Sequence, residues 1–162
     1  MDLRQLFDGL YYDGLSIACV ADIDVDEAVR RLDAEIADAE EDPDDLLLMW
    51  ATAVPGGCVI AQPWCYGAQM PSVTVPLSVD TTCYAMYANP KSGNQGSIIR
   101  GGAIASWDLH PGGEGEDPLS VEYEFHALAY CFAYVGLNPT DTRSVTGPPD
   151  RWIRVSDRDY QD

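Results

Sequence analysis

The residue types that carry most enzymatic chemistry are sparse in this chain and stand in no catalytic spacing. The two histidines, His110 and His126, fit neither a Cys-x-x-Cys nor a His-Glu-x-x-His pattern, which are spacings typical of zinc sites. Glu122 and His126 are four residues apart on a predicted helix, where a surface or capping contact is the ordinary role of such a pair. No serine or cysteine is paired by spacing with an activating base. The sequence therefore predicts no catalytic residue, no metal site and no cofactor, which favours a non-enzymatic protein.

Phosphate binding is not indicated either. The glycines within 93–96 and 112–115 lack the P-loop pattern, in which Gly-Lys-Ser or Gly-Lys-Thr closes the loop. The second stretch is accompanied by Glu114, Glu116 and Asp117, whose negative charge would repel an anion. We interpret both stretches as ordinary loops.

Carboxylates are the groups present in excess, and they are concentrated near the start of the chain. Of 27 acidic residues, 15 fall within the first 50 positions, together with three arginines. On a predicted helix, Asp26 would pair with Arg30 and Glu27 with Arg31, both at four-residue spacing. The acids left without such a partner follow this helix, and we expect them to lead the contact with a binding partner. They are Asp38, Glu40, Glu41, Asp42, Asp44 and Asp45.

One loop carries the aromatic side chains that core packing explains least. Residues 62–67 read Gln-Pro-Trp-Cys-Tyr-Gly, so Trp64 and Tyr66 stand among loop-forming residues rather than in an apolar strand. Most of the other aromatics fit a buried interior. We therefore predict that Trp64 and Tyr66 mark an anchor for a partner or a small pocket.

Hydrophobic periodicity predicts helices and strands over the first half of the chain. A helix is expected to begin at the N-cap Asp24, with Glu27 completing a capping box, and its apolar stripe continues to Ala39. Pro43 ends this pattern in a loop. The other elements predicted here are an amphipathic helix within 1–10, a buried strand at 15–21, a strand or buried helical turn at 46–54, and a strand at 58–62.

The second half is predicted to be richer in strands. Gly101 and Gly102 predict the turn of a hairpin. Asp117 and Pro118 predict a helix start, and the run that follows fits a strand or a helix, with its length and alanines favouring a helix to Gly136. The remaining segments are an unassigned proline-rich stretch at 63–76, a strand at 81–88, the hairpin strands at 96–100 and 103–109, and an edge strand at 152–155.

Together these elements predict the α+β class, with a mostly antiparallel sheet packed against two or three helices. At 162 residues the chain fits a single domain, 1–162, with an N-terminal helix at 1–10 and an extended tail at 141–162. Hydrophobic residues make up 46% of the chain, which is too large a share for a disordered protein.

The formal net charge of −18 restricts the class of partner. Binding to DNA depends on lysine and arginine side chains that displace counterions, and this chain has nine such residues in total, without a cluster. Acidic membrane surfaces are disfavoured for the same reason. A basic protein would instead be attracted, with an association rate that falls as salt rises.

Several features predict a cytoplasmic protein, in a bacterial cell or a phage-infected host. No apolar run approaches 18 residues, so no membrane span is expected, and the first residues do not resemble a signal peptide. The five cysteines lie mostly in apolar runs, as expected for small buried hydrophobes in a reducing compartment.

Six short motifs follow one another in a definite order along residues 10–140. They are the segment Cys19–Leu32, the strand and turn Gly57–Gly67, the step Leu77-Ser78, the strand Tyr84–Asn89, the hairpin turn Arg100-Gly-Gly102 and the helix end Gly136–Thr140. In this order they resemble a family of small actinobacterial proteins known only as a domain of unknown function. The resemblance implies a single α+β domain in the bacterial cytoplasm and no known activity, so it assigns no functional residue. The chain departs from the family at Gln62, where the family has a glutamate, and at Trp64-Cys65, which replace an Asn-Gly pair.

Three classes of function remain open on the sequence. The first is a non-enzymatic acidic protein that occludes a basic protein partner, as an inhibitor, an immunity-type protein or a phage-encoded protein acting on the host; mimicry of DNA is one form of it. The second is a structural or assembly subunit whose acidity serves solubility. The third is a small-ligand-binding or enzymatic domain that uses the loop at 62–67. We favour the first.

Overall fold

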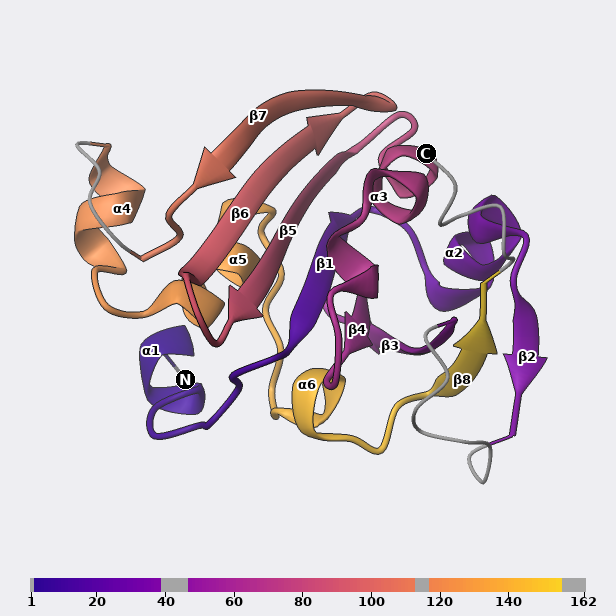
Figure 1. The fold of residues 1–162 in the computed structure, drawn as a ribbon, viewed down its shortest axis with the longest axis horizontal. Helices are drawn as coiled ribbons and strands as arrows, with labels where there is room; N and C mark the ends of the chain where they lie inside the picture. The colour runs from indigo at the N-terminus through magenta and orange to yellow at the C-terminus, as the bar shows by residue number, and fades with distance from the viewer. Residues whose placement is uncertain (1, 39–46, 113–116, 156–162) are drawn as a thin grey trace.

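The computed structural model describes residues 2–38, 47–112 and 117–155. Its centre is one eight-stranded sheet in the order β2-β8-β3-β4-β1-β5-β6-β7, and every neighbouring pair is antiparallel (Figure 1). The strands are β1 (Ser16–Ala21), β2 (Glu35–Ala37), β3 (Leu48–Val54), β4 (Gly57–Gln62), β5 (Thr82–Asn89), β6 (Gly93–Arg100), β7 (Ala103–Leu109) and β8 (Arg151–Arg154).

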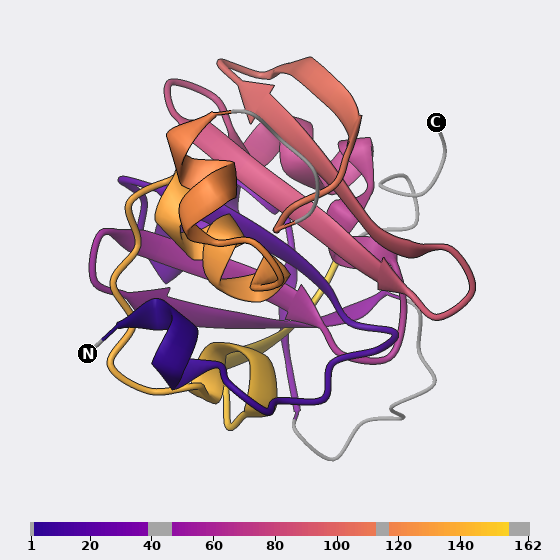
Figure 2. The same ribbon diagram turned by 90° about the vertical axis from the view of Figure 1, so that its left-hand side faces the viewer.

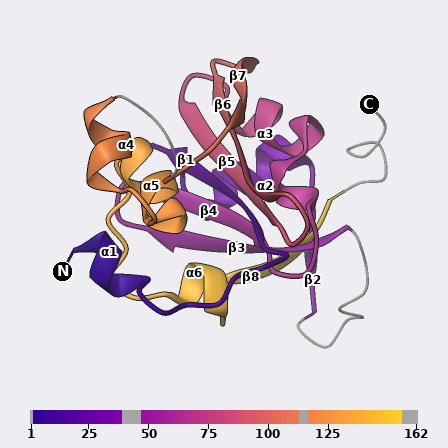
Figure 3. The same ribbon diagram turned by 60° about the vertical axis from the view of Figure 1, so that its left-hand side comes forward.

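Short helices cover both faces of this sheet. They are α1 (Leu3–Leu6), α2 (Val25–Leu32), the 3-10 turn η1 (Gly67–Gln69), α3 (Pro71–Leu77), α4 (Pro118–Glu122), α5 (Ala127–Tyr134) and α6 (Arg143–Thr146). Figure 3 shows α2 and α3 on one side of the sheet and α1, α4 and α5 on the other. The α+β class predicted from the sequence is confirmed, although the helices are shorter and more numerous than the two or three expected.

The central strand β1 explains why two helical layers are needed. Its side chains alternate between the faces: Ala18 and Val20 belong to the core under α2 and α3, and Ile17 and Cys19 belong to the core under α1 and α5. All four are 0% exposed. A strand that is apolar on both faces requires cover on both faces, which is the reason why the continuous apolar run at 15–21 predicts a buried strand correctly.

The helix that begins after Asp24 is shorter than predicted. The Asp24 side chain accepts a hydrogen bond from the Glu27 backbone N–H (2.8 Å), so the predicted N-cap is confirmed. The helix ends at Leu32 because Asp33 takes the left-handed conformation (φ 51°), and the Ala34 N–H bonds back to the Val29 carbonyl. The predicted continuation to Ala39 is therefore wrong, and its segment at 35–37 forms the edge strand β2.

The predicted helix over 118–136 is also divided. Asp117 caps α4 as expected, accepting from the Ser120 N–H at 2.9 Å, and Gly136 follows the end of α5 with φ 77°. Between the two helices, Phe125 has φ 66° and its N–H donates to the Gly112 carbonyl at 2.6 Å. This bond to a distant loop replaces a helical bond, so one helix becomes two.

The C-terminal part differs most from its prediction. Residues 143–146 form α6 and β8 lies between β2 and β3, so the described part of 141–162 is not an extended tail and the strand predicted at 152–155 is not at an edge. The N-terminal helix covers only 3–6 of the predicted 1–10. The unassigned stretch at 63–76 contains η1 and most of α3, where Pro71 occupies the first turn. Within the described ranges, no helix has both the length and the apolar composition that a bilayer crossing requires.

Candidate functional site

Most of the predicted acidic contact residues lie outside the described part of the chain. These are Glu40, Glu41, Asp42, Asp44 and Asp45. Asp38 is described; it is exposed and directly follows β2. In the described part of the chain, the candidate partner-binding surface consists of carboxylates around α2, the helix that precedes residues 39–46.

The predicted aromatic pair does not form one site. Trp64 packs in a cluster with Trp50 and Trp152, with ring centroids 6.1 and 6.3 Å away. Tyr66 instead contacts Tyr87 edge-on, at 6.1 Å. Trp50 belongs to the core under α1 and α5, whereas the Tyr87 side chain points to the opposite face, because it directly follows Met86 of that same core along β5. Trp64 is thus part of the packing, and Tyr66, which is 44% exposed, is the only member of the pair open enough to contact a partner.

The loop at 62–67 is held by one buried amide. The Gln62 side chain is 0% exposed; its Nε2 donates to the Leu48 carbonyl (3.0 Å), and its Oε1 accepts from the Gly67 N–H (2.7 Å). Both functions of the amide are therefore used to fix the loop, and this role is structural.

The carboxylates that stand free of ion pairs lie at the beginning of α2 and beside it. Asp22, Asp24 and Asp26 are exposed at the end of β1 and the start of α2, and Asp80 is exposed before β5. Among the described residues, none of these four forms an ion pair. We call these four residues the α2 acidic surface.

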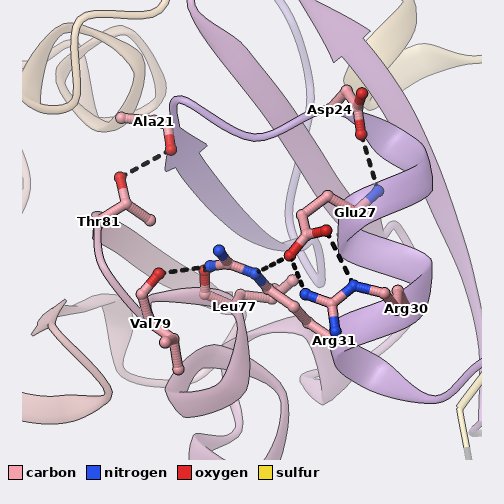
Figure 4. A network of polar contacts seen from close by, with 8 residues as sticks. All are labelled: Ala21, Asp24, Glu27, Arg30, Arg31, Leu77, Val79 and Thr81. Atoms are coloured by element: carbon pink, nitrogen blue, oxygen red, sulfur yellow. Dashed lines mark hydrogen bonds and ion pairs between the residues drawn. The ribbon is translucent and has the colours of Figure 1, made fainter.

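Both arginines of α2 are bound by one carboxylate. Glu27 accepts from Arg30 Nε (2.9 Å) and from Arg31 Nε (2.7 Å), as Figure 4 shows. Hydrogen bonds from Arg30 and then Arg31 lower the pKa of Glu27 to about 2. The predicted pair of Glu27 and Arg31 is confirmed. The predicted pair of Asp26 and Arg30 is wrong, because the Arg30 guanidinium binds Glu27 three residues before it, which leaves the Asp26 carboxylate exposed.

Arg31 also joins α2 to the segment between α3 and β5. Its Nη1 donates to the carbonyls of Leu77 (2.9 Å) and Val79 (2.6 Å). The turn before β5 is tied to β1 as well, since the Thr81 hydroxyl donates to the Ala21 carbonyl at 2.7 Å (Figure 4). These bonds fix Asp80 relative to α2.

Asp22 and Asp80 border the same hollow. They line a cavity of about 410 Å³ together with Thr81, Thr82, Arg100 and Tyr134. Both aspartates have left-handed backbones, with φ of 65° and 61°, a conformation that Asp and Asn tolerate better than other non-glycine residues. The α2 acidic surface was missed by sequence reasoning, which assigned Asp26 to local helix stability and had no basis for placing Asp80 near Asp22.

We predict that Arg31→Ala lowers the free energy of unfolding by about 2 kcal/mol, since it removes three charged hydrogen bonds from a side chain that is 15% exposed. Arg30→Ala is the matched control, because its side chain is 70% exposed and, among the described residues, bonds only Glu27; a change below about 0.5 kcal/mol is expected. Urea denaturation at pH 7 measures both. Equal losses would contradict the bridging role of Arg31.

This prediction has a defined dependence on pH. The folded pKa of Glu27 is depressed, so its stabilising contribution is present above the unfolded pKa, about 4.3, and is lost as the pH falls toward about 2. The difference between wild type and Arg31→Ala should therefore shrink over this interval. The bonds of Arg31 to the two carbonyls do not titrate and should leave a residual difference.

The cysteines and histidines form no reactive arrangement in the described ranges. Four cysteines are buried, as predicted, and burial raises the pKa of the Cys58 thiol to about 12. Cys65 is half-buried. In the described residues no group of three or more His, Cys, Asp or Glu side chains is placed to hold a metal ion.

Comparison of the chain with protein-family models, with curated proteins and with solved structures finds no match in any of the three.

Proposed function

We propose that this protein is a non-enzymatic acidic binding protein that occludes a basic protein partner, in the manner of an immunity or inhibitor protein or of a phage-encoded protein acting on its host. The contact is made by the α2 acidic surface together with the acidic residues that the sequence predicts to lead it, which are Asp38, Glu40, Glu41, Asp42, Asp44 and Asp45. The partner contributes lysine and arginine side chains, and its class includes a nuclease toxin or a nucleic-acid-binding host factor.

One observation carries this proposal: Glu27 alone binds both arginines of α2, so the carboxylates of the α2 acidic surface form no ion pair among the described residues. Residues 22–38 contain seven acidic side chains and these two arginines. Like charges at such density repel each other and oppose folding. A basic partner would remove this repulsion, and the long-range attraction would accelerate association at low ionic strength.

The location of the contact is tested by neutralising its charges. The variant D22N/D26N/D80N removes three charges while asparagine preserves the left-handed backbones at 22 and 80. Its control, D8N/D13N/E124Q, removes three exposed charges from elsewhere on the chain. Wild type and both variants are immobilised and exposed at low salt to lysate of an actinobacterium, the host class that the family resemblance implies, and retained proteins are identified by mass spectrometry.

We expect wild type and the control variant to retain the same basic protein, and D22N/D26N/D80N to retain at least about tenfold less of it, since each lost charge pair contributes roughly 0.5 kcal/mol or more. Retention should decline as salt rises. If the retained proteins are not basic, or if all three baits retain them equally, the proposal fails. Equal retention by all three at every salt concentration would favour the alternative of a structural subunit.

A further inference from the structure

A second hollow lies under α4 and α5, and Tyr134 of α5 lines both hollows. Its volume is about 530 Å³, within the range of roughly 300–1,000 Å³ that small-molecule sites occupy. Figure 2 shows α4 and α5 from the side on which they cover the sheet. The lining residues are Tyr84, Ile98, Leu109, His110, Asp117, Leu119, Ser120, Tyr130 and Tyr134.

Three tyrosines form the inner wall of this cavity, which we call the tyrosine cavity. The Tyr84 ring contacts those of Tyr130 and Tyr134, with centroids 5.4 and 5.0 Å away. Tyr84 and Tyr130 are 1% and 7% exposed and Tyr134 is half-buried, so most of the wall is shielded from water. Aromatic faces carry partial negative charge and attract cations, and this attraction strengthens when water is excluded.

The Tyr84 hydroxyl is a polar group left without a partner. It forms no hydrogen bond with any described residue, although the residue is almost completely buried. Burial raises the pKa of this phenol, so the hydroxyl stays protonated and neutral. Space for it depends on Gly96, because a Cβ there would lie 2.6 Å from the hydroxyl oxygen. Tyr84 lines the cavity, so its hydroxyl, which has no protein partner among the described residues, can bond water or a ligand there.

The rim adds a fixed negative charge and apolar surface. Asp117 is exposed and accepts hydrogen bonds from Ser120 N (2.9 Å) and Ser120 Oγ (2.7 Å), which lower the pKa of its carboxyl. Its carboxylate retains further lone pairs for a ligand. Ile98, Leu109 and Leu119 provide walls for an apolar body.

The chain already uses tyrosine rings to hold guanidinium groups. Arg100 donates to the Tyr134 hydroxyl and lies 6.0 Å from the ring centroid, in the neighbouring cavity that it shares with Asp22 and Asp80. Arg4 lies 5.7 Å from the ring of Tyr123, in the turn between α4 and α5. Neither arginine lines the tyrosine cavity. Arg100 contacts one of its three rings, Tyr134, whereas Tyr84, Tyr130 and Asp117 contact neither arginine.

We infer that the tyrosine cavity is a binding site for a small organic cation, an alkylammonium or alkylguanidinium with a short apolar body. The cationic head lies against the tyrosine rings and toward Asp117, the Tyr84 hydroxyl accepts an N–H bond where the head offers one, and the apolar body contacts the leucine and isoleucine walls. This site is independent of the α2 acidic surface.

The test titrates full-length protein at constant ionic strength with butylammonium and butylguanidinium, while NMR follows the tyrosine ring resonances. Butanol is the uncharged comparison, ammonium is the cation without an apolar body, and butyrate is the anion. We expect saturable shifts at Tyr84, Tyr130 and Tyr134 for the two organic cations, and binding about tenfold tighter than that of butanol. Equal binding of butanol, equal effects of ammonium, or shifts spread evenly over all tyrosines would overturn the inference.

Variants assign the contacts. Tyr84→Phe keeps the ring and removes the hydroxyl, and Asp117→Asn keeps a good N-cap while removing the charge. Each should weaken butylammonium binding several-fold. The matched controls are Tyr87→Phe, on the same strand but facing the other side, and Asp141→Asn, whose carboxylate accepts from the backbone N–H of Arg143 at the start of α6. If the control variants weaken binding as much as the cavity variants, the cation does not bind in the tyrosine cavity. If a cavity variant fails to fold, the NMR shifts of the wild-type tyrosines still show whether the cation binds there.

Discussion

Replacing Gly57 by alanine is expected to abolish the folded state, with a loss of more than about 4 kcal/mol in the free energy of unfolding. Gly57 begins β4 and pairs with Ala21 of β1. A Cβ on Gly57 would lie 2.0 Å from the Val20 carbonyl oxygen and 3.0 Å from Leu137 Cδ2. The first contact is with backbone, which no rotamer change can relieve, so β1 and β4 would have to separate at the centre of the sheet. A typical domain has only about 5–15 kcal/mol of stability to lose.

Gly57→Ala is also expected to displace Asp22 of the α2 acidic surface. The Asp22 N–H donates to the Gly56 carbonyl at 2.9 Å, and Gly56 itself has φ 102°. The close approach of the β3–β4 turn to β1 therefore determines where Asp22 leaves the sheet. Gly93→Ala is the control, because no atom lies within 4 Å of a new Cβ there; its positive φ of 86° alone is expected to cost about 1 kcal/mol. Soluble yield, far-UV circular dichroism and urea denaturation measure both variants. A folded Gly57→Ala protein would contradict the tight packing of β1 on β4.

Features that depend on neighbouring residues were predictable from the sequence. The predicted helix caps at Asp24 and Asp117 are confirmed, because a capping aspartate bonds a backbone N–H only three residues ahead. The hairpin turn predicted at Gly101 and Gly102 is confirmed, because both turn residues have positive φ, which glycine adopts freely.

The end of α2 shows where local patterns fail. Ile36 continues the apolar stripe of the helix, so periodicity alone extends the helix through it. In the fold Ile36 pairs with Ile153 of β8, more than a hundred residues later. The left-handed turn at Asp33 is favourable only because a strand is available for pairing beyond it, and no window of sequence near residue 33 contains that information.

The same limit applies to the candidate sites. The spacing of Glu27 and Arg31 reveals their ion pair, but the carbonyls that Arg31 also binds lie 46 and 48 residues away. Tyr130 and Tyr134 are four residues apart and visibly share a helix face, whereas Tyr84 joins them only through the packing of α5 on β5. The prediction for Trp64 and Tyr66 treated one loop as one site, and the loop sends these side chains to different faces of the sheet.

Gln62→Glu is expected to destabilise the protein at pH 7 by at least about 3 kcal/mol, although the two side chains have nearly the same shape. The Gln62 amide donates to Leu48 and accepts from Gly67 in a site that is 0% exposed. An ionised glutamate only accepts, so the Leu48 carbonyl would lose its donor and face a buried negative charge. The loop that places Trp64 against Trp50 and Trp152 would loosen as a result.

The pH dependence of this variant separates charge from shape. Burial would raise the folded pKa of the carboxyl that Gln62→Glu introduces above its unfolded value of about 4.3. Below that value the carboxyl is protonated in both states, and its O–H can donate to Leu48. The loss of stability should therefore be small at pH 4 and should grow as the pH rises toward the folded pKa.

Gln69→Glu is the control for this comparison. Gln69 donates to the Gln95 carbonyl (3.1 Å) from a half-buried position where water can replace the bond. Urea denaturation at pH 4 and pH 7 should show a loss below about 1 kcal/mol for it at both values. A Gln62→Glu variant whose loss is the same at both pH values would mean that the amide fixes the loop through its shape and not through its donor.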